Sequence, residues 1–170
     1  MRHTLSVLVQ NESGVLAKIS GLFSGRGFNI ESLTVAPTQD LDYSRVTIVT
    51  SGDDKIIEQI CKQLNKLVNI LKVVDITGEG SIERELVLIK INAKEQERSE
   101  ILRIAEIFDA KIIDVSPKTY TLEAMGDEVK IRSLIELLRP IGIKELVRSG
   151  KVAISRELQL NNTNCRLAAV

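Results

Sequence analysis

The order of predicted elements occurs twice in this chain, and it constrains the fold more than any other feature. Apolar residues recur at the three- and four-residue spacing of an amphipathic helix in the stretches 15–23 and 56–68. Runs typical of buried strands flank these stretches, at residues 5–9, 28–36, 44–50 and 71–77. The first 78 residues therefore predict the order β-α-β-β-α-β.

The remainder of the chain repeats the pattern. Helix faces are predicted at 101–108 and 131–138, and strands at 85–91, 111–115, 120–124, with a closing strand or hairpin at 143–155. Pro37 and Pro117 end similar apolar runs 80 positions apart. We predict an α+β protein of two tandem ferredoxin-like βαββαβ domains, residues 1–78 and 81–157, each an antiparallel sheet with two helices on one face. Residues 158–170 are predicted to be a disordered tail.

The charge balance argues against several classes of partner. Lys and Arg number 23, Asp and Glu number 23, and aromatic residues make up 3% with no Trp. This composition offers neither a basic surface for nucleic acid or anionic membranes nor stacking platforms for bases. No apolar run could span a membrane and no signal peptide is visible, so we expect an intracellular soluble protein, in a bacterial cytoplasm or a plastid stroma.

Few residues suit catalysis or metal binding. His3 is the one histidine, and Cys61 and Cys165 stand far apart with no metal-ligand spacing. No phosphate-binding glycine loop and no HExxH motif occurs. We therefore expect a chain without catalytic residues, metal or bound cofactor of its own.

Glycines distinguish the first repeat from the second. Gly14, Gly21, Gly25 and Gly27 lie in or beside the first predicted helix, whereas residues 81–125 contain none. A glycine inside a helix lowers its stability by about 1 kcal/mol relative to alanine, so we expect another interaction to compensate at these positions. For Gly21, close packing of the helix against the sheet is as good an explanation as a functional role. Gly14 would leave the N–H groups of the helix N-terminus open to a carboxylate.

Two further features suggest a shared binding site. The amide of Asn11 could accept a hydrogen bond from an ammonium group, or could form a local Asx turn instead. The second strand lies at the edge of a ferredoxin-like sheet and carries Ile30, Leu33 and Val35 with a single charge, so two copies could pair across it. Such a dimer would bring Asn29 and Ile30 of one chain towards Gly14 of the other.

The runs Asn11–Leu16 and Phe23–Val35 closely resemble the small, regulatory subunit of acetohydroxyacid synthase (acetolactate synthase). The first half is similar to its ACT domain, and residues 112–115 and 148–150 resemble its second domain. The resemblance covers residues 1–157. It implies a homodimer that activates a separate catalytic (large) subunit and confers feedback inhibition by a branched-chain amino acid, usually valine. The catalytic subunit would carry thiamine diphosphate, magnesium and FAD, and would catalyse the first shared step towards valine, leucine and isoleucine.

The resemblance also assigns roles to individual residues. It places an effector site between the loop and helix start of one copy and the second strand of the other, formed by Asn11, Gly14, Val15, Leu16, Asn29 and Ile30. The alternative within binding modules is a free-standing amino-acid sensor that controls another biosynthetic enzyme. An enzyme and a transcription regulator are the alternatives from other classes, and neither has a motif in the sequence to support it.

Overall fold

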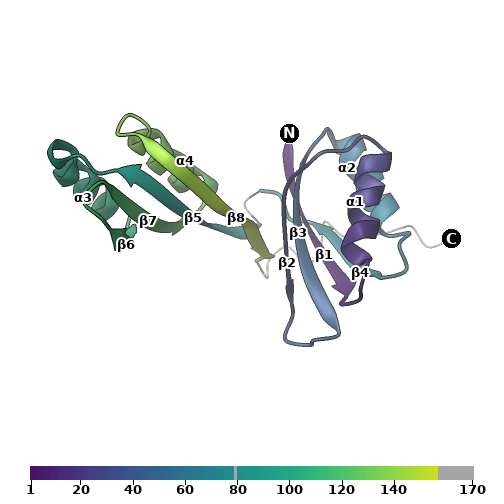
Figure 1. Cartoon of the computed structure of the whole chain (residues 1–170). Helices are drawn as coiled ribbons and strands as arrows, with labels where there is room; N and C mark the ends of the chain where they lie inside the picture. The colour runs from purple at the N-terminus through teal and green to yellow at the C-terminus, as the bar shows by residue number, and fades with distance from the viewer. Residues whose placement is uncertain (79, 157–170) are drawn as a thin grey trace. The chain divides into compact units, whose positions relative to one another are not determined.

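The computed structural model describes residues 1–78 and 80–156 (Figure 1). The predicted tail at 158–170 lies outside these residues. The contacts divide the chain into two compact units. Of the described residues, those within Met1–Ile82 and residues 151–156 form the first, and Glu83–Gly150 form the second. The prediction assigned all of residues 81–157 to the second domain, whereas the contacts place residues 151–156 with the first unit.

The first unit is a four-stranded antiparallel sheet in the order β2-β3-β1-β4. Its elements are β1 (Arg2–Gln10), α1 (Val15–Gly25), β2 (Ile30–Pro37), β3 (Tyr43–Ser51), α2 (Asp54–Leu64) and β4 (Ile70–Asp75). The predicted order of elements and the edge position of the second strand are confirmed. That strand begins at Ile30 rather than at residue 28, because the ring of Phe28 packs edge-on against Phe23 of α1, with the ring centres 6.2 Å apart.

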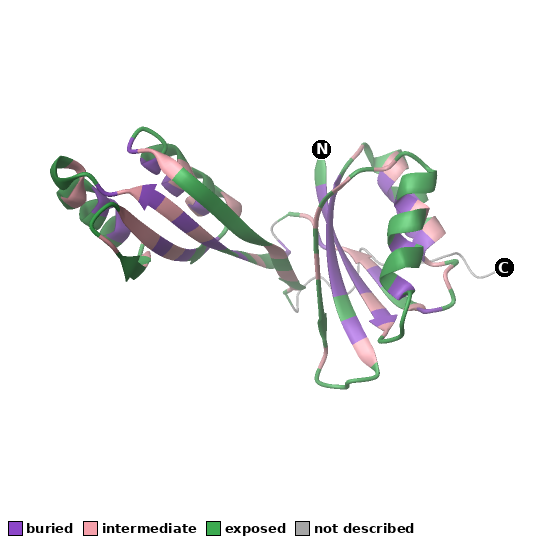
Figure 2. Ribbon diagram, in the orientation of Figure 1, coloured by how far each residue is buried: buried purple, intermediate pink, exposed green. Residues whose placement is uncertain are grey.

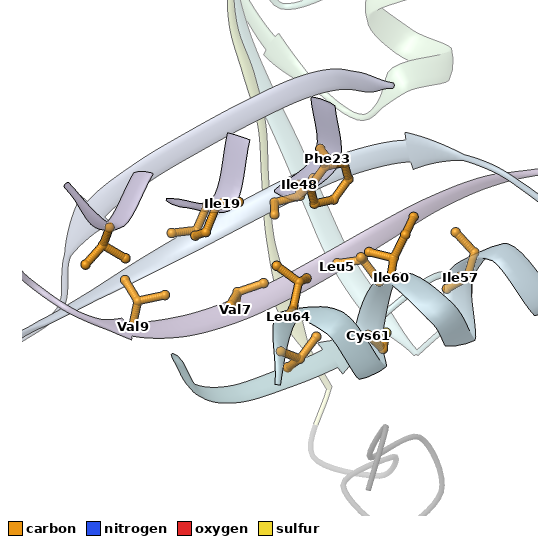
Figure 3. Packing of buried hydrophobic residues seen from close by; sticks show 13 residues of the cluster. Leu5, Val7, Val9, Ile19, Phe23, Ile48, Ile57, Ile60, Cys61 and Leu64 are labelled. Carbon is orange, nitrogen blue, oxygen red and sulfur yellow. The ribbon is translucent and has the colours of Figure 1, made fainter. Parts of the chain in front are cut away.

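One hydrophobic core holds the first sheet and its helices together. Leu5, Val7 and Val9 of β1 are almost fully buried in this core, and their spacing of two places their side chains on one face of the sheet. Figure 3 shows these side chains gathered with those of α1 and α2 in one cluster. Figure 2 shows that α1 is buried only at spaced positions and is exposed along the rest of its surface. The helices therefore cover one face of the sheet.

The second unit repeats this architecture with the strand order β6-β7-β5-β8. Its sheet and helices are formed by β5 (Ser81–Asn92), η1 (Glu95–Glu97), α3 (Arg98–Ile107), β6 (Lys111–Val115), β7 (Thr119–Gly126), α4 (Glu128–Leu138) and β8 (Ile143–Ser155), of which residues 81–82 and 151–155 belong by their contacts to the first unit. Val87, Ile89 and Ile91 of β5 are fully buried in its core. The α+β fold of two tandem βαββαβ repeats is thus confirmed. Of the two predicted endings, the structure has the closing strand, because β8 runs through Gly150 without reversing.

Lys151, which lies in β8 and belongs by its contacts to the first unit, is hydrogen-bonded to the edge strand of the first sheet. Lys151 donates its main-chain N–H to Ser32 Oγ at 3.2 Å, and Thr34 Oγ1 donates to the carbonyl of Lys151 at 2.7 Å. Leu33 and Val35 face the helix side of the sheet, so Ser32 and Thr34 face the opposite side. These bonds are among the contacts that place residues 151–156 with the first unit.

Candidate functional site

The N-terminus of α1 is open. Its cap residue, Gly14, lies in the left-handed region at φ 84°, and no side chain caps the helix and no acidic residue occupies its first turn. The main-chain N–H groups of Leu16 and Ala17 have no acceptor in the described part of the chain. A Cβ added at Gly14 would meet no atom within 4 Å. This helix end can therefore receive a carboxylate, which the helix dipole favours.

Asn11 is fastened to the turn between β2 and β3. Its Nδ2 donates to the carbonyl of Leu41 at 2.9 Å, and its main-chain N–H donates to the carbonyl of Asp42 at 2.7 Å. The Asx turn considered for this residue is therefore not formed. Its Oδ1 accepts no hydrogen bond from residues 1–78 or 80–156, so it can accept one from an ammonium group.

The two residues after Gly14 are placed differently. The side chain of Val15 is 4% exposed and belongs to the core, so only its main chain can reach a ligand. Leu16 is 39% exposed and leaves an apolar side chain beside the open helix end. A ligand bound there would have Leu16 as its apolar neighbour within the same chain.

Asn29 and Ile30 lie at the other end of the sheet. Ile30 pairs with Thr50, which also pairs with His3 near the start of β1, whereas Asn11 follows Gln10 at its end. At about 3.3 Å per residue, these two ends of β1 are roughly 23 Å apart. One chain therefore does not bring the two sets of predicted site residues together. Asn29 is exposed, and its carbonyl accepts from Thr50 Oγ1 at 2.7 Å.

A buried polar cluster supports the loop that precedes α1. Asn69, which comes just before β4, is only 7% exposed and bonds Gln10, Glu12 and Lys18. This residue was not predicted from the sequence, because an isolated asparagine between a helix and a strand carries no local signal. Its partners lie more than 50 positions earlier in the chain.

The second repeat has no matching helix end. Its first helix, α3, follows the turn η1 (Glu95–Glu97), has Glu97 as its cap residue and has Glu100 in its first turn. These carboxylates would repel the carboxylate of a ligand. The difference in glycine content between the repeats therefore coincides with a difference in what each helix N-terminus can bind.

Two other groups singled out from the sequence are structural. His3 is 7% exposed, and its Nδ1 lies 2.9 Å from Asp75 Oδ2. Arg148 Nε donates to the buried Glu85 at 2.9 Å, and this bond raises the pKa of the arginine above its usual value. Residues 1–78 and 80–156 contain no cluster of three His, Cys, Asp or Glu side chains suited to a metal ion. They also contain no helix long and apolar enough to cross a membrane.

Comparison with known proteins decides the family. The family model of the small subunit of acetolactate synthase matches residues 84–157, and that of the AHAS small subunit-like ACT domain matches residues 5–72. The acetolactate synthase small subunit of Aquifex aeolicus is 52% identical over 160 residues, which span 94% of this chain and 83% of that one. The chain belongs to the acetolactate synthase small-subunit family.

Other members of the family agree. The acetolactate synthase small subunit of Mycobacterium bovis is 51% identical over 154 residues, which cover 91% of this chain and 92% of that one. The crystal structure of the small subunit from Thermotoga maritima superposes with a TM-score of 0.85 at 42% identity, covering 92% of this chain and 98% of that chain. As an acetolactate synthase small subunit with an ACT domain, the chain has a regulatory role beside a catalytic large subunit.

Proposed function

We propose that this small subunit activates the catalytic subunit of acetolactate synthase and makes it sensitive to feedback inhibition by a branched-chain amino acid, valine foremost. The observation that carries the proposal is the open N-terminus of α1 at Gly14, with Oδ1 of Asn11 nearby in the same loop. The helix end suits an α-carboxylate and the amide oxygen suits an α-ammonium group, so an amino acid can satisfy both.

A dimer across β2 would complete this site. If two β2 strands pair antiparallel about a two-fold axis at Thr34, Ile30 of one copy lies opposite Pro37 of the other, because the bulge between Ile30 and Ser32 adds one residue to the strand. Pro37 is level with Val9 through their common partner Ser44, two residues before Asn11. The pairing would therefore carry Asn29 and Ile30 of one copy to the loop of residues 11–14 of the other, which we call the effector loop.

The exposed side chains of β2 support this pairing. Leu33 is 38% exposed and Val35 is 44% exposed along the edge. The one acidic residue of the strand, Glu31, is bonded by Arg2 Nε at 2.7 Å and by the hydroxyl of Ser51, which reduces its repulsion of a second copy. Unpaired apolar edge strands are prone to aggregate. Pairing with β2 of a second copy would cover this edge and would account for its apolar side chains.

The side chain of the effector would lie among apolar groups. Leu16 of one copy is exposed, whereas Ile30 of the other is partly buried against its own core. Both would be apolar neighbours of the ligand, which favours a branched aliphatic side chain over a charged one. We place thiamine diphosphate, magnesium and FAD on the catalytic subunit. This chain would contribute regulation only, within the synthesis of valine, leucine and isoleucine.

Titration of valine, leucine and isoleucine into the purified chain by calorimetry tests the proposal, together with assays of acetolactate formation by the reconstituted holoenzyme. We expect valine to bind and to inhibit the complex, and we expect the small subunit to raise the rate of the catalytic subunit. Binding without co-purification of a catalytic subunit would favour the alternative of a free-standing amino-acid sensor. If none of the three amino acids binds, the proposed site is wrong.

A further inference from the structure

Asn69 is the most extensively bonded polar side chain around the effector loop. Its Nδ2 donates to Gln10 Oε1 at 2.9 Å and to Glu12 Oε2 at 2.8 Å, and its Oδ1 accepts from Lys18 Nζ at 2.7 Å. Its main-chain carbonyl accepts the N–H of Gln10 at 2.9 Å. The amide thus uses both of its donors while it is 7% exposed.

These bonds fasten the loop at both ends. Gln10 is the last residue of β1, Glu12 lies inside the loop and Lys18 is on α1. Asn11 and Gly14 lie between the fastened positions. We propose that Asn69 is a positioning residue for the effector site, which it acts on through Glu12 and Lys18 without touching the ligand. This inference rests on the proposed amino-acid site.

The negative charge of Glu12 explains why its position matters for the site and why its bond to Asn69 is important. Glu12 is the one acidic residue in the loop, two positions before Gly14, and the open N–H groups of Leu16 and Ala17 attract any nearby carboxylate. Asn69 holds Glu12 by a hydrogen bond to its carboxylate. Released from that bond, Glu12 would occupy the helix N-terminus itself and compete with the carboxylate of the effector. Asn69 therefore keeps the site open by restraining an internal competitor.

The decisive variant is Asn69→Asp, which preserves size and the acceptor for Lys18 but removes both donors and repels Glu12. Calorimetry with valine on the full chain should show affinity reduced by about tenfold or more, as expected for releasing a charged competitor. Hydrogen exchange of residues 10–17 should be faster in the same variant without ligand. Lys18→Met, a milder change that removes only the bond to Oδ1, should reduce affinity by about threefold.

A double variant separates positioning from general stability. In Asn69→Asp with Glu12→Gln, the amide of residue 12 donates to the new carboxylate, which restores the bond with donor and acceptor exchanged. We expect this variant to recover most of the affinity, whereas Glu12→Gln alone should bind nearly as the unmodified chain does. The matched control is Asn65→Asp, which removes the donor to the Cys61 carbonyl at the end of α2 and should leave affinity unchanged.

The outcomes are distinguishable. If the unmodified chain binds valine and Asn69→Asp binds it equally well, the inference is wrong while the proposed function stands. Loss of affinity in Asn69→Asp without recovery in the double variant would show that Glu12 is not the competitor and would also overturn it. If the unmodified chain binds no branched-chain amino acid, the proposed function fails and this inference fails with it.

Discussion

At the scale of single residues, glycine has two different roles in α1. Gly14 needs its conformational freedom, because its φ of 84° is unfavourable for residues with a Cβ. Gly21 does not, and a Cβ added there would meet no atom within 4 Å. Close packing of helix on sheet is therefore wrong as the reason for Gly21. Gly21 is exposed, and nothing in the first unit explains a glycine at this position of the helix.

Gly14→Asp should reduce the affinity for the effector by tenfold or more, at about 1.4 kcal/mol per decade. The new carboxylate would stand where the carboxylate of the ligand is expected, beside the open helix end. Calorimetry with valine measures the loss. Gly14→Asn is the matched control, because asparagine has the same size, no charge and tolerance of the left-handed region. Equal losses in the two variants would show that backbone strain, not charge, is responsible.

Gly21→Ala should stabilise the chain by about 0.5–1 kcal/mol, because alanine loses less backbone entropy in a helix and finds open space here. Urea denaturation of both forms at one protein concentration measures the difference. Gly52→Ala is the contrasting control, since its Cβ would lie 2.8 Å from a side-chain atom of Ile56. A destabilised Gly21→Ala chain would show that a close partner contacts α1 at this position.

At the scale of elements, β2 connects several features of the molecule. It is the edge strand of the first sheet, it begins next to Asn29, and its Ser32 and Thr34 bond the main chain of Lys151 at the end of β8. The face of β2 that carries Leu33 and Val35 remains partly exposed. A single strand thus carries candidate dimer contacts and a connection to the last strand of the chain.

Leu33→Lys should weaken the dimer, because two lysines would approach each other near the two-fold axis proposed for β2. Sedimentation at micromolar concentrations should show a shift from dimer towards monomer. Leu71→Lys on β4, the opposite edge strand, is the matched control, since Leu71 is 49% exposed and outside the proposed interface. An unmodified chain that sediments as a clean monomer would contradict the interface and the shared site together.

At the scale of the whole molecule, Asn29 and Gly14 lie too far apart within one chain to hold one ligand, so the proposed effector site would couple ligand binding to dimer assembly. A ligand held by Gly14 of one copy and Asn29 of the other can bind fully only to the dimer. By linkage, the effector must then tighten the dimer by the same factor by which dimerisation tightens effector binding.

Asn29→Ala should reduce effector affinity by about 1–3 kcal/mol, because it removes a hydrogen-bonding group that comes from the second copy. It should also abolish the tightening of the dimer by valine. Sedimentation of both forms with and without valine measures the two effects. If valine leaves the dimerisation constant of the unmodified chain unchanged, the ligand does not bridge the two copies, even where valine binding itself is confirmed.

The sequence by itself determined the features that depend on local periodicity and on single backbone positions. The spacing of apolar residues predicted both repeats, because burial on one face imposes that spacing. The order of these elements indicated a ferredoxin-like sheet, and that topology placed the second strand at an edge. Gly14 was identifiable because a glycine at a helix start has no side chain to cap the free N–H groups. Only the tertiary structure showed that Asn69 supports the effector loop, that Asn11 bonds the carbonyl of Leu41 and that Lys151 bonds β2. These contacts join positions distant along the chain, and hydrogen bonds between such positions leave no periodic pattern in the sequence.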